Sequence, residues 1–293
     1  MLKNLDYVVV QILGFISNAH SCLNAWATKK ILIREFKEYK KEDYEIIKDV
    51  SVAHIYNLRR TRQYQTHALT FTKTQAVHQG DSKEKKGVYH INSVDEVTQW
   101  ENAASVEKIS EAYLEPILKI IIGQYPFTIF EFHADNGSEY INKVVVALLN
   151  KLLIKLTKSR SRKCNDNALV ESKNGSVIRK HMGYFYINQK YAPEINDFYM
   201  KYFNPYLNFH RPCGFATIEI DKKGKQKKVY NLYQTPYESL KKITGAGKFL
   251  KPGIFFEKLD KIAEEYSDNE FAAIMEKEKQ KLFRKIKINP VDF

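Results

Sequence analysis

The stretch LEPILKIIIGQYPFTIFEF, residues 114–132, decides the fold class that we expect for this chain. Its first half repeats apolar residues at helical spacing, namely Leu114, Ile117, Leu118, Ile121 and Ile122. Its second half, residues 127–132, is a short apolar run of the kind that forms a buried strand. A helix that leads directly into a strand is a building unit of α/β proteins, so we predict a mixed α/β fold.

The residues on both sides extend this pattern. From residue 75 to residue 107 the sequence is typical of strands, and residues 88–99 are rich in β-branched side chains, which indicates an antiparallel meander. Apolar residues at helical spacing over 141–152 predict a second helix, and residues 154–157 predict another strand. Strands that alternate with helices favour a partly parallel sheet covered on both faces, with binding residues at the carboxyl ends of its strands.

The composition points to a packed, basic protein. Lys and Arg number 47 against 34 Asp and Glu, which gives a formal net charge of +13, so nucleic acid is the first partner to consider. Hydrophobic residues make up 44% of the chain, which excludes a disordered or low-complexity protein. The cysteines Cys22, Cys164 and Cys213 are too far apart in sequence for a disulfide framework or a zinc pair, which favours a reducing cytoplasm.

An apolar stretch near the N-terminus raises the question of export. Residues 7–28 carry no Asp, Glu, Lys or Arg, and their first part has the composition of a signal-peptide core. Polar side chains interrupt the stretch well short of the ~20 apolar residues that a membrane helix needs. They are Gln11, Ser17, Asn18, His20, Ser21 and Asn24. We therefore expect a buried helix here, no export and no membrane partner.

The region that follows, residues 29–65, predicts helices. Ser51 is the expected N-cap of a helix whose apolar face is formed by Val52, Ile55 and Leu58. The cations of this helix are Arg59, Arg60 and Arg62. An apolar stripe with cations on the remaining surface fits the recognition helix of a helix-turn-helix, and it fits an ordinary solvated basic helix equally well.

Two acids have the context of a catalytic site. Asp135 comes just after the predicted strand 127–132, and Glu171 falls in the first turns of a predicted helix, with 35 residues between them. Carboxylates that converge from separate elements can hold two Mg²⁺ ions about 4 Å apart for phosphoryl transfer. The alternative is a turn Asp and a helix-capping Glu that do not meet.

Basic residues surround these acids. The segment 158–163 between the two acids carries four cations that could hold DNA phosphates beside the metals: Lys158, Arg160, Arg162 and Lys163. Lys173 and Lys180 are seven positions apart on the predicted Glu171 helix, so they would share one face and extend the same basic track. Each could also be a surface cation without a partner. His133 and His181 lack His or Cys neighbours, so packing or hydrogen bonding rather than zinc is expected there.

Five segments, in family order, resemble the integrase catalytic region of bacterial insertion-sequence transposases. They are GVYHINSVDEVTQ (87–99), HADNGSEYIN (133–142), SRSRKCNDNALVESKNGSVIRK (159–180), NPYLNFHRP (204–212) and TPYESL (235–240). The resemblance implies a ribonuclease-H-like mixed sheet flanked by helices, and DNA integration or transposition as the function. It also implies a location on the nucleoid in the bacterial cytoplasm and homo-oligomers assembled on mobile-element ends and target DNA.

The resemblance further implies an Asp, Asp, Glu triad that binds Mg²⁺ or Mn²⁺. Asp135 and Glu171 match its last two acids as catalytic residues and metal ligands, whereas Gln75 stands where the family has its first Asp. Losing one of three formal charges weakens the binding of two divalent ions, so we expect impaired or absent catalysis. Asp81 and Asp95 are the nearby acids that could substitute. The alternatives are a catalytically dead protein that still binds DNA and a remnant without function.

We expect three segments along the chain. Residues 1–68 form an N-terminal helical, helix-turn-helix-like segment, and residues 72–243 form the ribonuclease-H-like catalytic core. Residues 244–293 form a C-terminal tail, helical from residue 257 to residue 287 and mixed in charge, which packs on the core or serves assembly.

Overall fold

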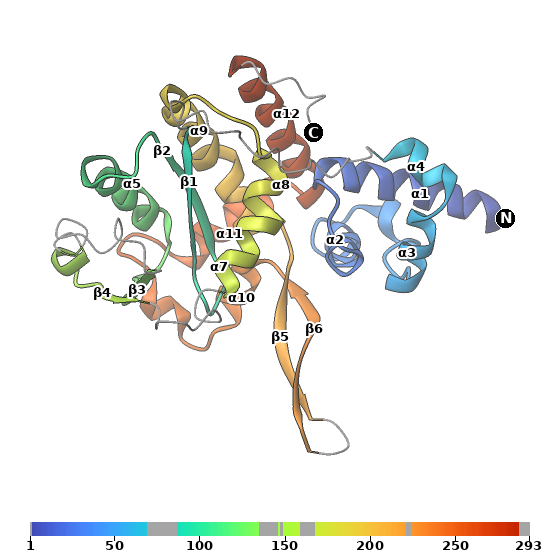
Figure 1. Ribbon diagram of the computed structural model, residues 1–293. Helices are drawn as coiled ribbons and strands as arrows, with labels where there is room; N and C mark the ends of the chain where they lie inside the picture. Colours follow the sequence, from blue (N-terminus) through green and yellow to red (C-terminus); the bar gives the residue numbers. More distant parts are fainter. Residues whose placement is uncertain are drawn as a thin grey trace. The chain divides into compact units, whose positions relative to one another are not determined.

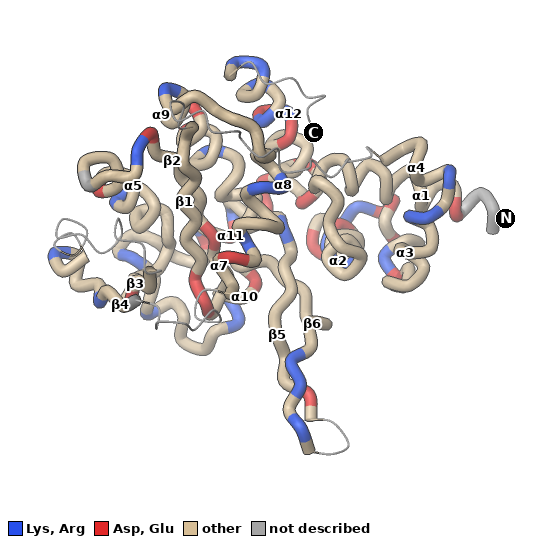
Figure 2. Tube along the Cα trace, in the orientation of Figure 1, with Lys and Arg blue, Asp and Glu red and all other residues tan. Residues whose placement is uncertain are grey.

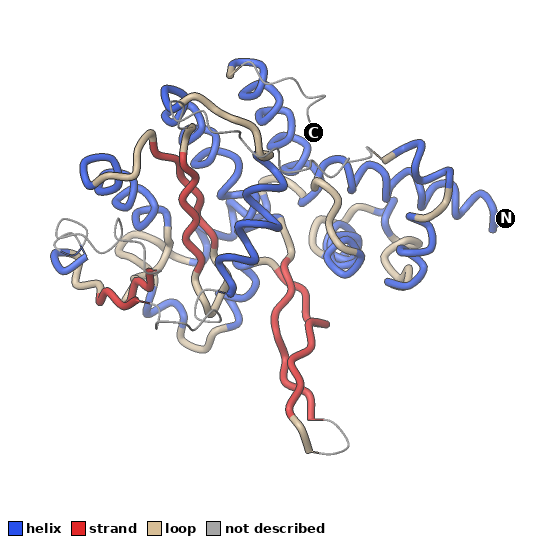
Figure 3. Tube along the Cα trace, viewed as in Figure 1, coloured by secondary structure: helices blue, strands red, loops and turns tan. Residues whose placement is uncertain are grey.

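The chain is a mixed α/β protein, as predicted (Figures 1 and 3). The computed structural model describes residues 2–68, 87–134, 146, 149–158, 168–220 and 224–286. Within these ranges the strands form three separate two-stranded sheets. The predicted ribonuclease-H-like arrangement also depends on residues 69–86 and 135–145, which lie outside the described residues.

Two compact units make up the chain, and each joins segments that are distant in sequence. The first unit comprises Met1–Thr72, Pro205–Ile243 and Glu257–Glu278, and the second comprises Lys73–Asn204, Thr244–Phe256 and Lys279–Phe293. The division into consecutive segments at residues 68, 72 and 243 stays a prediction.

The N-terminal part of the first unit is helical. Its elements are α1 (Leu2–Ala19), α2 (Ala25–Lys37), η1 (Glu42–Tyr44), α3 (Val52–Arg59) and α4 (Arg62–His67). They enclose one apolar cluster whose largest fully buried side chains are Leu13, Ile16, Ile31, Leu32, Ile47 and Ile55. The apolar stretch 7–28 is therefore largely buried, as expected. Among the described residues, no helix combines the length and apolarity needed to cross a membrane.

Side-chain caps fix where these helices begin. The predicted N-cap Ser51 is confirmed, because its hydroxyl accepts a hydrogen bond from the backbone N–H of His54 at 3.1 Å. Asn24 caps α2 and Thr61 caps α4 in the same way. Each such cap stabilises its helix by about 1 kcal/mol.

The rest of the first unit follows a short helix, η7 (Tyr206–His210). It contains an antiparallel hairpin, β5 (Cys213–Ile220) and β6 (Gln226–Gln234), and then α10 (Pro236–Lys242). The predicted helical tail is confirmed as α11 (Phe256–Glu264) and α12 (Asp268–Lys285). The first part of α12 belongs to the first unit and its last part to the second.

The described part of the second unit starts with the hairpin β1 (Tyr89–Val94) and β2 (Glu101–Val106), which confirms the antiparallel strands predicted in this region. Every residue of β2 is buried. Two asparagine side chains form hydrogen bonds along the edge of β2 that does not face β1. Asn196 bonds to the backbone N–H and C=O of Ser105, and Asn204 bonds to the backbone N–H and C=O of Ala103. These amides satisfy backbone groups that a neighbouring strand would otherwise pair with.

A helix and a parallel strand pair follow. Helix α5 (Glu111–Gln124) confirms the predicted helix, and its residues Leu118 and Ile122 pack in one cluster with Ile154 next to β4. Strand β3 (Glu131–Ala134) pairs in parallel with β4 (Lys155–Lys158).

The predicted strand 127–132 is only partly correct. Its first residues pair elsewhere, because Phe127 bridges to Leu250 and the Thr128 N–H donates to the carbonyl of Phe249 at 2.8 Å. Strand β3 therefore starts later than predicted, at Glu131.

The unit continues with a helical run. Its elements are α7 (Ala168–Lys173), the π-helix η4 (Asn174–Ile178), α8 (Arg179–Met182), η5 (Gln189–Tyr191), α9 (Ala192–Phe198) and η6 (Tyr199–Phe203). Helices α5 and α9 pack against β2, and α7 packs against β1, so helices cover this hairpin.

Candidate functional site

Glu171 lies on α7, the helix that packs against β1. Its side chain is exposed, although the helix that carries it is held against the sheet. This arrangement presents a carboxylate to solvent from a fixed backbone position, which is what a metal ligand or a contact to a bound molecule requires.

Lys173 fixes this helix in place. Its ammonium group lies 3.3 Å from the Glu101 carboxylate on β2, and the two side chains are only 7% and 1% exposed. Glu101 also accepts a hydrogen bond from the side chain of Asn92 on β1 at 3.0 Å. The ion pair is therefore almost completely removed from water and ties α7 to both strands of the hairpin.

The predicted basic track along this helix is wrong for Lys173. We expected Lys173 and Lys180 on one exposed face, yet Lys173 is buried while Lys180 is exposed. The reason is the π-helical segment Asn174–Ile178 between them, which changes the number of residues per turn and so the direction of every following side chain. Lys173 holds the site together rather than lining it.

The other half of the predicted acid pair adjoins β3. Strand β3 ends at Ala134, and its parallel pairing with β4 places the carboxyl ends of both strands at the same edge. Asp135 is the next residue in the sequence, but Asp135 and Gln75 both lie outside the described residues. Among the described residues no group of three His, Cys, Asp or Glu side chains has the geometry to hold a metal, so the Mg²⁺ site stays a prediction.

Asp95, one of the two acids considered as a substitute for the missing Asp, stabilises a turn. Its carboxylate accepts hydrogen bonds from the N–H and the hydroxyl of Thr98, at 2.7 and 2.6 Å, in the connection between β1 and β2. These hydrogen bonds within the turn account for an aspartate at position 95 by local structure alone. Asp81 lies outside the described residues.

The three arginines of the predicted recognition helix differ in their surroundings. Arg59 donates to the carbonyl of Leu23 and to the hydroxyl of Thr28, both at 2.8 Å, so its guanidinium joins the end of α3 to α2. Arg60 and Arg62 are exposed. Of these three arginines, Arg60 and Arg62 therefore present their charge to solvent.

The basic segment between the two acids is only marginally described. Lys158 is the last residue of β4. Arg160, Arg162 and Lys163 lie outside the described residues, so their role as DNA contacts stays a prediction.

The two isolated histidines serve packing and hydrogen bonding, as expected. His133 Nδ1 lies 2.9 Å from the Thr157 hydroxyl across the β3–β4 pair. His181 is buried, with its ring edge-on to Phe203 at 5.1 Å between centroids.

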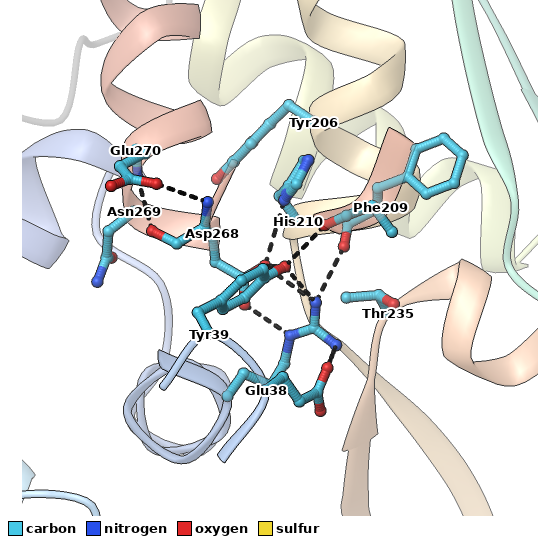
Figure 4. A network of polar contacts seen from close by, with 12 residues as sticks. Glu38, Tyr39, Tyr206, Phe209, His210, Thr235, Asp268, Asn269 and Glu270 are labelled. Atoms are coloured by element: carbon cyan, nitrogen blue, oxygen red, sulfur yellow. Dashed lines mark hydrogen bonds and ion pairs between the residues drawn. The ribbon is translucent and has the colours of Figure 1, made fainter. Parts of the chain in front are cut away.

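A buried polar network in the first unit was not foreseen from the sequence (Figure 4). Arg34 on α2 donates from Nε and Nη2 to the two carboxylate oxygens of Asp268, at 2.6 and 3.0 Å. Asp268, the first residue of α12, also accepts from the Tyr39 hydroxyl at 3.0 Å. Both members of the ion pair are nearly inaccessible to water, so the network joins α2 to the C-terminal helix.

His210 completes this network. Its Nδ1 lies 3.3 Å from Asp268, and its ring stacks on Phe271 at 4.5 Å. Burial lowers the pKa of His210. Burial alone would raise the pKa of Asp268, but Arg34 and His210 hold it well below its usual range. The carboxylate is thus charged and fully paired, and it is too deeply buried to meet a substrate.

Comparison with known proteins adds little to this geometry. No protein-family model matches the chain. The uncharacterized protein y4rM of Sinorhizobium fredii is 29% identical over 107 residues, which is 36% of this chain and 31% of the relative. The match thus spans about a third of the relative's length, and the relative's name states no activity.

Proposed function

We propose that this chain is a transposase/integrase-family protein that acts on DNA by metal-dependent phosphoryl transfer, with catalysis weakened or abolished because Gln75 replaces the first acid of the triad. The observation that carries this proposal is the position of Glu171, exposed on a helix that packs on β1 and that Lys173 ties to β2. A rigidly held, solvent-facing carboxylate fits the oxygen donors that Mg²⁺ prefers.

The order of elements supports the same family. An antiparallel hairpin, a helix, a parallel strand pair and then the Glu171 helix follow one another in the second unit. In a ribonuclease-H-like core, a strand from the Gln75 region would join the two strand pairs into one mixed sheet. Asp135 would then follow directly on β3, at the carboxyl ends of β3 and β4, where such sites lie.

In the proposed chemistry, Asp135 and Glu171 would hold Mg²⁺ or Mn²⁺, which would supply positive charge for the activation of a water or 3′-hydroxyl and for the stabilisation of the departing oxygen. The protein contributes position: α7 holds Glu171 at a fixed distance from the sheet. Gln75 offers a neutral carbonyl where a third negative charge is needed.

DNA binding would be shared between the N-terminal segment and the core. Helices α3 and α4 are separated by two residues, Arg60 and Thr61, and Arg60 and Arg62 face solvent, which supports a helix-turn-helix-like role. The net charge of +13 favours a polyanionic partner in any case.

Nicking of supercoiled plasmid with Mg²⁺ or Mn²⁺ tests the proposal. We expect weak or no nicking by the unchanged protein and a clear gain in the Gln75→Asp variant. Adding Glu171→Gln to Gln75→Asp should remove the gain, whereas adding Glu265→Gln, at an exposed position on the other unit, should not. If Gln75→Asp gains nothing while the protein stays folded, the proposed site is wrong.

A DNA-binding protein without catalytic activity is the second candidate, and the amide at Gln75 favours it. Its binding would weaken steeply with salt and need no divalent metal, because phosphate contacts release counterions whether or not metals are bound. Unchanged duplex affinity in excess EDTA, together with no nicking, would support this candidate.

A further inference from the structure

Among the contacts of the described residues within its own unit, the hairpin β5–β6 is anchored at its base. There Tyr233 stacks on Trp26 with 6.3 Å between ring centroids, and its hydroxyl accepts a hydrogen bond from Asn24 at 2.8 Å. Figure 1 shows the strands running from this base as a two-stranded arm whose distal end lies beyond the helices of its own unit. Eight residues of β5 at about 3.4 Å each give an arm roughly 27 Å long.

The distal half of this arm exposes both apolar and basic side chains. Ile218, Ile220 and Tyr230 are 63%, 70% and 58% exposed. Lys227 and Lys228 are exposed beside them, and Figure 2 shows Lys and Arg gathered toward this end of the hairpin.

The strand register sorts these side chains onto two faces. Ile218 pairs with Lys228 and Ile220 with Gln226, so these four share one face, while Lys227 stands opposite Glu219 on the other. One face therefore combines the two aliphatic side chains Ile218 and Ile220 with Lys228. Lys227 is the next residue in β6 and points to the opposite face.

An isolated two-stranded ribbon is marginally stable in water, and its two outer edges leave backbone groups unpaired. Large exposed apolar side chains in such a ribbon are typical of a surface that meets a partner. Lysines next to them select the partner by charge, because they favour a polyanion and disfavour a membrane interior or an apolar protein surface.

We propose that the distal half of the β5–β6 arm inserts into the major groove of duplex DNA. The groove is about 12 Å wide and admits a two-stranded ribbon. Lys227 and Lys228 contact phosphates on the groove walls, and Ile218 and Ile220 contact base edges such as the thymine methyl group. This inference rests on the proposed DNA-directed function and adds a binding element to it.

Fluorescence anisotropy of the full chain with a labelled 30-base-pair duplex over a salt series tests the arm. The variant Lys227→Gln/Lys228→Gln removes two cations from the arm. Its matched control, Lys258→Gln/Lys261→Gln, removes two exposed cations from α11 in the same unit. Circular dichroism checks that both variants fold, which is expected because all four lysines are exposed.

Loss of two phosphate contacts should lower the slope of log affinity against log salt by roughly 1.8, whereas the control should keep the slope of the unchanged protein. Replacing the aliphatic pair by Ile218→Thr/Ile220→Thr should weaken binding several-fold without changing the slope. Equal slopes for the arm variant and the control would overturn the arm's role while leaving DNA binding intact.

Two other outcomes would also overturn the inference, and each has a separate meaning. If the unchanged protein does not bind the duplex at all, both the arm's role and the proposed DNA-directed function are wrong. If sedimentation shows self-association that Ile218→Thr/Ile220→Thr abolishes while duplex affinity stays the same, the arm is a contact between copies of this chain.

Discussion

The ion pair between Lys173 and Glu101 ties the helix that carries Glu171 to the hairpin, so its removal is an informative perturbation. The substitution Lys173→Met keeps the apolar stem of the side chain and deletes its charge. Glu101 would then keep a buried negative charge with Asn92 as a remaining donor at 3.0 Å. We expect partial loosening of α7 from the hairpin.

The size of the effect follows from burial. Breaking a buried ion pair by removing one partner costs roughly 3–5 kcal/mol, because the remaining charge stays out of water and loses its counter-charge. Since Lys173 and Glu101 are 7% and 1% exposed, solvent screens little of this cost. At roughly 2 °C or more per kcal/mol, the melting temperature should fall by about 6 °C or more. The double variant Lys173→Met/Glu101→Gln removes both charges and should recover much of the loss.

Thermal unfolding followed by circular dichroism measures these differences. The control is Lys119→Met, which breaks an exposed pair with Glu115 at 2.6 Å on α5 and should change the stability by less than about 1 kcal/mol. In the Gln75→Asp background, Lys173→Met should also reduce any nicking activity. A melting temperature that matches the Lys119→Met control would refute the argument that this pair holds α7 in place.

Three further predictions concern stability. Burial lowers the pKa of His20 and of His90 to about 4. Below pH 6.5 the unfolded chain therefore binds more protons at these two histidines than the folded chain does. Each histidine should lower the free energy of unfolding by about 2 kcal/mol at pH 5 relative to neutral pH. His90→Gln should therefore flatten the decline of the melting temperature between pH 7 and pH 5, and an unchanged decline contradicts this. Asp268→Asn removes the most deeply buried counter-charge of Arg34 and leaves it with Glu38 and Glu238, so it should lower the unfolding free energy in urea by at most about 3–5 kcal/mol. Thr235→Ala removes the capping box of α10 and should cost about 1 kcal/mol, and no change would show that Pro236 alone starts the helix.

Local patterns predicted the elements that depend on neighbouring residues. The periodicity of residues 114–122 predicted α5, and Ser51 predicted the start of α3, because spacing and capping act within a few residues. The strand at 127–132 was misplaced at its start for the opposite reason. Phe127 and Thr128 pair with residues 249 and 250, more than a hundred positions away, and no local pattern carries that information.

In the candidate site, too, local features could be predicted from the sequence and long-range contacts could not. The expected helix start and the family resemblance singled out Glu171, and the described structure gives its helix a fixed place on the sheet. The role of Lys173 could not be predicted, because seven-residue spacing assumes a regular α-helix and the π-helical turn at 174–178 breaks that assumption. Its partner Glu101 lies in a strand whose residues are all buried, where a charge is unexpected unless a counter-charge reaches it.

His210 and Thr235, which lie in two of the segments that carry the sequence resemblance, gain a physical explanation from the first unit. His210 bonds Asp268 and stacks on Phe271, so it secures the start of α12. Thr235 caps α10 in a capping box with Glu238, and Glu238 in turn pairs with Arg34 at 3.1 Å. Both residues are therefore linked to the buried Arg34–Asp268 pair, His210 directly and Thr235 through Glu238. In the sequence they flank the β5–β6 arm, so they fix the two ends of its base.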